Sequence, residues 1–123
     1  MIELRYFELS EFDSPDAPGS GRNMHEHTLL KLDQARHLFG APMRITSGYR
    51  TPEHNRKVGG VENSAHTRGY AADISTAGMR ERDVVRLIAC LTKVGFDRIG
   101  RGKTFVHVDD DPEKPSPAYW DYG

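Results

Sequence analysis

Residues 64–73 of this 123-residue chain read Ser64-Ala65-His66-Thr67-Arg68-Gly69-Tyr70-Ala71-Ala72-Asp73. It places a histidine and a glycine in a loop, and an aspartate in the strand that follows, which is predicted over residues 71–75. Asp73 falls in the middle of that strand, between Ala72 and Ile74. An aspartate inside an apolar strand is unfavourable unless a cation or a hydrogen-bond donor faces it. The stretch therefore predicts that Asp73 has such a partner.

A second histidine lies in the predicted strand Phe105-Val106-His107-Val108-Asp109. Because side chains alternate along a strand, His107 and Asp109 share one face and the two valines occupy the other. We expect the valine face to be core and the histidine face to carry a site. Two histidines and an aspartate are a metal-ligand set, and a catalytic zinc takes three protein ligands with water in the fourth position. On spacing alone, a structural alternative is equally compatible, in which Asp73 caps a turn and His107 packs against Trp120.

The rest of the chain mixes helix and strand without a regular βαβ alternation. Helices are predicted over about 24–39, from 51 to just before 59, and over about 79–93, and short strands over 43–47, 71–75, 96–100 and 104–109. This order predicts an α+β fold, with a small antiparallel sheet and flanking helices. The length fits a single domain over residues 1–123, of which residues 1–23 form an irregular N-terminal arm.

Composition narrows the class of protein. Seventeen Lys+Arg nearly balance eighteen Asp+Glu, which argues against a nucleic-acid binder. The longest apolar run, Leu87–Leu91, is too short to cross a membrane, and residues 1–5 show no signal peptide. The single cysteine, Cys90, excludes an internal disulfide framework and cysteine-rich metal ligation. We therefore expect a protein that binds neither nucleic acid nor membranes.

The pattern Ser64-x-His66-x-x-Gly69-x-Ala71-x-Asp73, followed by His107 in a strand, resembles the zinc D-Ala-D-Ala metallopeptidases. That family includes D,D-carboxypeptidases, murein endopeptidases and phage endolysins, and the zinc-binding domain of Hedgehog signalling proteins shares its fold. The segment Ser47-Gly48-Tyr49-Arg50 is also similar to a family motif, and the resemblance covers roughly residues 24–120. The resemblance implies a Zn²⁺ cofactor, with His66, Asp73 and His107 as its ligands and with Arg50 and Ser64 as substrate-binding residues.

The general base does not follow from this resemblance. The family places an acidic residue three positions before the third ligand, and that position is Thr104 here. Asp109 is the best substitute on geometry, because it shares a face with His107 and lies two residues away. It acts either as the catalytic base or as a group that orients a metal ligand. Glu53 and Glu62 are weaker candidates, because both lie in segments expected to be exposed.

The implied function is a zinc peptidase that hydrolyses stem or cross-link peptides of peptidoglycan, as a D,D-carboxypeptidase or as an endopeptidase of the endolysin type. The alternative is a zinc-stabilised binding or structural module of the same fold that has lost hydrolysis. Thr104 favours the module, whereas Arg50 and Ser64 favour the enzyme. We expect a monomer. It is either cytoplasmic or phage-encoded, and in the second case it reaches the cell wall through a holin or as part of a virion.

Overall fold

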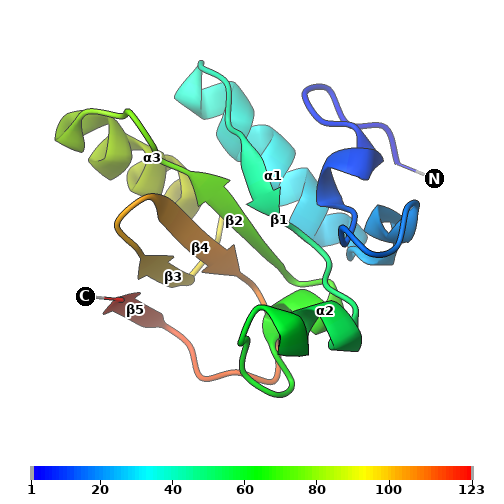
Figure 1. Ribbon diagram of the computed structural model, residues 1–123. Coiled ribbons are helices and arrows are strands. Elements are labelled where there is room, and N and C mark those ends of the chain that lie inside the picture. Colours follow the sequence, from blue (N-terminus) through cyan, green and yellow to red (C-terminus); the bar gives the residue numbers. More distant parts are fainter. Residues whose placement is uncertain (1, 123) are drawn as a thin grey trace.

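The structure is a computed structural model that describes residues 2–122. Within these residues a five-stranded sheet runs in the order β1-β2-β4-β3-β5 (Figure 1). The strands are β1 (Ile45–Ser47), β2 (Ala71–Ser75), β3 (Arg98–Arg101), β4 (Phe105–Asp109) and β5 (Ala118–Asp121), and the helices are α1 (Glu26–Phe39), α2 (Pro52–Lys57) and α3 (Glu81–Lys93). This combination confirms the predicted α+β fold class. No helix in this part of the chain combines the length and the apolarity that crossing a membrane would require.

The strands β1, β2, β4 and β3 pair antiparallel, as predicted, and β5 joins the sheet parallel to β3. The sequence does not predict β5, because prolines at 112, 115 and 117 dominate the approach to it. The register aligns one residue from each strand in a row across the sheet: Ser47, Asp73, His107, Gly100 and Trp120. The row explains how residues far apart in the sequence come to lie together.

The two faces of the sheet have different roles. Val106 and Val108 are fully buried, and they share one hydrophobic core with Leu32 of α1 and Leu87 of α3. Burial of each aliphatic side chain of this size is worth about 1.5–3 kcal/mol. The prediction that the valine face of β4 is core is therefore confirmed. The opposite face presents the polar residues of β2 and β4.

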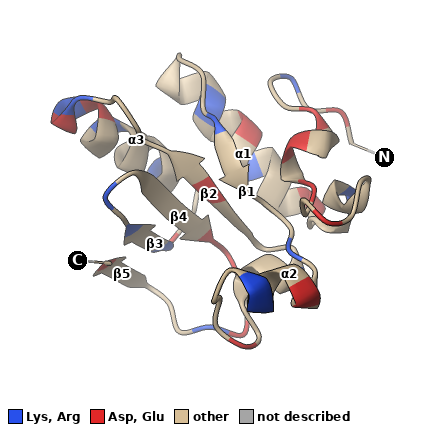
Figure 2. Cartoon of the chain, in the orientation of Figure 1, with Lys and Arg blue, Asp and Glu red and all other residues tan. Residues whose placement is uncertain are grey.

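Helix α2 begins as its sequence predicts. The Thr51 hydroxyl accepts a hydrogen bond from the His54 N–H at 3.1 Å, and Pro52 occupies the first turn, where its missing N–H is not needed. Glu53 lies in the first turn and Lys57 in the last, so the charges complement the helix dipole (Figure 2). The helix follows directly after the segment that contains Arg50.

The N-terminal arm braces that same segment. It contains two short 3₁₀ helices, Leu9–Phe12 and Ser20–Asn23. Phe12 is fully buried, and its carbonyl accepts a hydrogen bond from the Tyr49 N–H at 2.9 Å. Gly48 packs against the backbone of Phe12 so closely that a side chain there would collide with it. The arm thus fixes the backbone on which Arg50 is mounted.

Candidate metal centre

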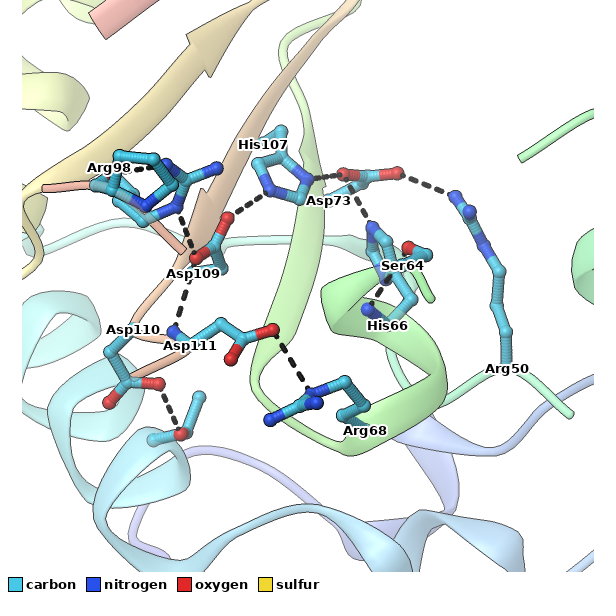
Figure 3. A network of polar contacts seen from close by, with 12 residues as sticks. Arg50, Ser64, His66, Arg68, Asp73, Arg98, His107, Asp109, Asp110 and Asp111 are labelled. Carbon is cyan, nitrogen blue, oxygen red and sulfur yellow. Dashed lines mark hydrogen bonds and ion pairs between the residues drawn. The ribbon is translucent and has the colours of Figure 1, made fainter. Parts of the chain in front are cut away.

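His66 is presented by a 3₁₀ helix, Ala65–Arg68, in a stretch that the sequence predicts as loop. The Ser64 hydroxyl caps this helix by accepting a hydrogen bond from the His66 N–H at 3.2 Å. Gly69 ends it with φ 81°, in the left-handed region that favours glycine. The short helix places the His66 ring opposite Asp73 of β2 (Figure 3).

A backbone carbonyl fixes the tautomer of His66. Its Nδ1 lies 2.8 Å from the Gly48 carbonyl oxygen, and because a carbonyl only accepts, Nδ1 carries the proton. In the neutral ring Nε2 keeps a lone pair for a metal ion, whereas in the protonated ring its N–H faces Asp73 Oδ1, 3.3 Å away. The Arg50 N–H also donates to the His66 carbonyl at 3.1 Å. These bonds join the segment that contains Gly48 and Arg50 to the short helix that carries His66.

His107 is the direct cross-strand partner of Asp73. Its Nδ1 lies 3.1 Å from Asp73 Oδ1, the oxygen that also faces His66. Its Nε2, on the other side of the ring, lies 2.7 Å from Asp109 Oδ2 (Figure 3). A carboxylate on the outer nitrogen of a histidine is the usual arrangement around a metal, because it orients the ring and makes the inner nitrogen more basic.

The three residues fit a zinc ion. One ligand atom from each of His66, Asp73 and His107 lies within 4.8 Å of the others. A tetrahedral site with bonds of about 2.0–2.1 Å places its ligand atoms about 3.4 Å apart. Asp73 Oδ1 lies at similar distances from the two histidine nitrogens, 3.3 Å from His66 Nε2 and 3.1 Å from His107 Nδ1. Nitrogen and carboxylate oxygen donors suit Zn²⁺, and three of them leave a fourth position open. The donor types and their spacing are therefore compatible with a zinc site.

The charges of the cluster are strongly coupled. Burial raises the pKa of Asp73, but hydrogen bonds from His107 and His66 outweigh it and hold that pKa well below its usual range. Burial lowers the pKa of His107, but its hydrogen bonds with Asp109 and Asp73 raise that pKa above its ordinary value. Asp73 is thus an anion that attracts a cation, either protons on the histidines or a metal ion.

The Asp109 carboxylate has partners on both oxygens. Besides the contact of Oδ2 with His107, its Oδ1 accepts a hydrogen bond from Arg98 Nε at 2.8 Å and one from the Asp111 N–H at 3.2 Å. Only 1% of the residue is exposed. Burial raises the pKa of Asp109, but the hydrogen bond with His107 and the neighbouring charges lower it overall. The group is an anchored carboxylate on the far side of His107 from Asp73.

All six predicted site residues line a single pocket of about 470 Å³, namely Arg50, Ser64, His66, Asp73, His107 and Asp109. The weaker base candidates lie elsewhere, Glu53 beside His54 in a second pocket and Glu62 beside Asn55 in a third. Thr104 is exposed and is not among the residues that line the pocket of the six predicted site residues.

The sequence does not predict three further ionisable residues of the lining, Arg98, Lys114 and Tyr122. Arg98 could have been predicted from the sequence, because pairing of β3 with β4 places it directly across from Asp109. Lys114 and Tyr122 could not have been predicted, because they belong to the proline-rich segment, in which no periodic pattern indicates the path of the chain.

Arg50 is held beside Asp73 by hydrogen bonds on every nitrogen. Its Nε donates to Ser47 Oγ at 3.0 Å and its Nη1 to Asn55 Oδ1 at 3.1 Å, while Nη2 lies 3.4 Å from Asp73 Oδ2. A guanidinium has five N–H groups, so these contacts leave donors for a ligand in the pocket. Figure 3 shows Arg50 and Arg98 on opposite sides of the His/Asp cluster.

Comparison with known proteins agrees with this geometry. A zinc D-Ala-D-Ala carboxypeptidase of Streptomyces albus G is 42% identical over 79 residues, which is 59% of this chain and 31% of that protein. The chain thus matches about a third of the length of that relative. The family model for peptidase M15 matches residues 5–109, a range that contains all six predicted site residues. The resemblance identified from the sequence is confirmed, and the chain belongs to the peptidase M15 family.

Proposed function

We propose that the chain is a zinc peptidase acting on the short peptides of peptidoglycan, with His66, Asp73 and His107 as the zinc ligands. One observation carries the proposal. Hydrogen bonds on the outer nitrogens turn both histidines so that their inner nitrogens face the same Asp73 oxygen, at the wall of a pocket. Zinc, when bound, supplies a Lewis acid that polarises a carbonyl group and lowers the pKa of water.

Arg50 is the proposed receptor for a substrate carboxylate. Its guanidinium is planar and fixed at three nitrogens, and such a fork binds a carboxylate with two parallel hydrogen bonds. A terminal carboxylate held there would place the preceding peptide bond near Asp73. Ser64 uses its oxygen to cap His66 and keeps its own O–H as a donor toward the pocket. These roles favour a carboxypeptidase over an endopeptidase.

Asp109 is proposed to orient His107 rather than to act as the base. Both of its oxygens are already engaged, and the carboxylate is almost completely buried. Its contact is with the outer nitrogen of His107, so the metal site lies on the other side of the ring. A general base must be within hydrogen-bonding reach of the water whose proton it takes. Asp109 could take that role only if it left His107.

The engagement of Asp109 by its neighbours supports a second candidate function. Asp73 and Asp109 are the carboxylates in the described lining of the pocket, and both are engaged. A domain that keeps zinc but lacks a free base would bind peptidoglycan peptides without cutting them. This candidate predicts full zinc occupancy and peptide binding with no hydrolysis.

Incubation of the zinc-loaded protein with purified sacculi, followed by mass spectrometry of the soluble products, tests the proposal. A carboxypeptidase releases free D-amino acids, whereas an endopeptidase opens cross-links and releases larger fragments. The His66→Ala variant should release neither, while His54→Ala, a histidine outside the site, should match the wild type. A zinc-loaded wild type that releases nothing from any type of peptidoglycan would support the non-catalytic module instead.

A further inference from the structure

The pocket contains one cation that the metal centre does not use. Of the three lysine and arginine residues in its lining, Arg50 pairs with Asp73 and Arg98 pairs with Asp109. The third, Lys114, makes no side-chain hydrogen bond or ion pair with any residue between 2 and 122, although it contributes to the field around its neighbour Glu113. Glu113 itself pairs with Arg68. An ammonium group without an anionic partner at a pocket wall is available to a ligand.

The electrostatics of the pocket favour an anion at this position. The two carboxylates that line the pocket are each paired with an arginine, so neither of them neutralises Lys114. A bound divalent ion would add further positive charge. A pocket with a single sign of net charge raises the local concentration of the opposite charge, here a carboxylate.

The backbone on both sides of Lys114 is anchored. Before it, the Asp111 carboxylate lies 3.2 Å from Arg68 Nε and its Oδ1 accepts the Glu113 N–H at 3.0 Å. After it, the Pro115 carbonyl accepts a hydrogen bond from Arg98. The Lys114 N–H itself donates to the Asp111 carbonyl at 3.2 Å. The lysine is therefore mounted on a fixed turn, and less conformational freedom is lost when a ligand binds.

These anchors also set the side of the pocket on which Lys114 lies. Pro115, the next residue, is bonded to Arg98, and Arg98 lies across the His/Asp cluster from Arg50 (Figure 3). If Arg50 holds the terminal carboxylate, Lys114 faces the other end of the peptide. Arg98 is occupied by Asp109 and stacks on Trp120, with Cζ 5.1 Å from the ring centroid. Lys114 is the lining cation on that side whose side chain has no hydrogen-bond or ion-pair partner among residues 2–122.

Resting on the proposed function, we infer that Lys114 is a specificity-determining residue that binds a side-chain carboxylate on the amino-terminal side of the scissile bond. The preferred substrates are then acidic peptides with two carboxylates, one at the C-terminus for Arg50 and one upstream for Lys114. Neutral peptides of the same length bind more weakly.

Trp120 provides a readout that does not depend on hydrolysis. It is the single tryptophan of the chain and it lines the pocket, so peptide binding to the zinc-loaded protein can be followed by its fluorescence. The probes are N-acetyl-Glu-D-Ala-D-Ala and N-acetyl-Gln-D-Ala-D-Ala, which differ in one carboxylate. The variants are Lys114→Gln and, as a control with the same charge change, Lys93→Gln on the exposed end of α3.

The wild type and Lys93→Gln should bind the Glu peptide roughly 10-fold more tightly than the Gln peptide, as expected for a charge-assisted hydrogen bond. Lys114→Gln should bind both peptides with equal affinity. Equal affinities in the wild type, the same preference in Lys114→Gln, or no saturable binding would overturn the inference. The inference would also be overturned if Lys114→Gln changed only the preference for peptides with a free C-terminus over peptides with an amidated C-terminus. If the wild type binds the Glu peptide more tightly but cleaves neither peptide, the role of Lys114 is supported and only the proposed hydrolytic activity is contradicted.

Discussion

At the scale of single residues, the least expected finding is how completely Asp109 is engaged. The residue is buried, with one carboxylate oxygen on His107 and the other on Arg98. A carboxylate in this position fixes the ring it contacts and raises the basicity of the inner nitrogen. Replacing such a partner typically costs about 10–100-fold in metal affinity.

Asp109→Asn is therefore expected to weaken zinc binding about 10–100-fold while the fold is kept, and added zinc should restore activity. Competition with a chromophoric chelator gives the affinity, and a titration of activity against zinc gives the rescue. Asp110→Asn is the matched control, because Asp110 pairs instead with Thr28 and Lys31 of α1. A variant with unchanged zinc affinity and a loss of about 10²–10⁴-fold in kcat at all zinc concentrations would make Asp109 the base after all.

Arg50→Lys keeps the positive charge but loses the planar fork that contacts Ser47, Asn55 and Asp73. For peptides with a free C-terminal carboxylate we expect KM to rise roughly 10-fold, because a bidentate charged pair becomes a single contact. For the corresponding peptide amides KM should change little. Steady-state kinetics on both peptides checks this, and an equal rise for the two would show that Arg50 does not bind the carboxylate.

At the scale of elements, the register of the sheet assembles the site. His107 has Asp73 on one side and Gly100 on the other, and Gly100 in turn pairs with Trp120 of β5. The indole of Trp120 lies directly over Gly100, where a Cβ atom would collide with it. The absence of a side chain at Gly100 therefore lets Trp120 lie against His107, with ring centroids 5.5 Å apart.

Gly100→Ala is expected to displace Trp120 from the pocket wall and to lower the free energy of unfolding by about 1–3 kcal/mol, as overpacking usually does. The tryptophan emission maximum should move toward that of a solvent-exposed indole, and peptide binding should weaken. Ala118→Gly, in the same strand as Trp120 but outside the pocket lining, is a control for changes in β5. An unshifted emission maximum with unchanged stability would contradict the close packing of Trp120 on Gly100.

The predictable parts of the structure are those with local causes. Thr51 and Pro52 specify the start of α2 through a cap and a missing N–H, and alternation assigns His107 to the polar face of β4. The 3₁₀ helix that carries His66 was not predicted, because one turn of i→i+3 bonds has no periodic signature. The parallel addition of β5 depends on contacts between Trp120 and β3 that sequence spacing does not encode.

At the scale of the whole molecule, three consecutive acidic residues connect the site to different parts of the fold. Asp109 binds His107, while Asp110 binds α1 through the Thr28 hydroxyl at 2.6 Å. Asp111 lies 3.2 Å from Arg68 Nε, at the end of the short helix that carries His66. The proposed metal ligands are thus coupled to the core, and forming their cluster requires the folded chain.

Because the ligands come together only in the folded chain, zinc should stabilise the fold by mass action. With zinc at about 1,000 times its dissociation constant, the free energy of unfolding should rise by about 4 kcal/mol. For a domain of this size that corresponds to a rise in Tm of about 10–20 °C. Differential scanning calorimetry with zinc and after chelation measures it. His54→Ala should keep the shift and His66→Ala should lose most of it, because His54 lies outside the cluster of ligand atoms. An equal shift in both variants would show that zinc acts elsewhere and would remove His66 from the site.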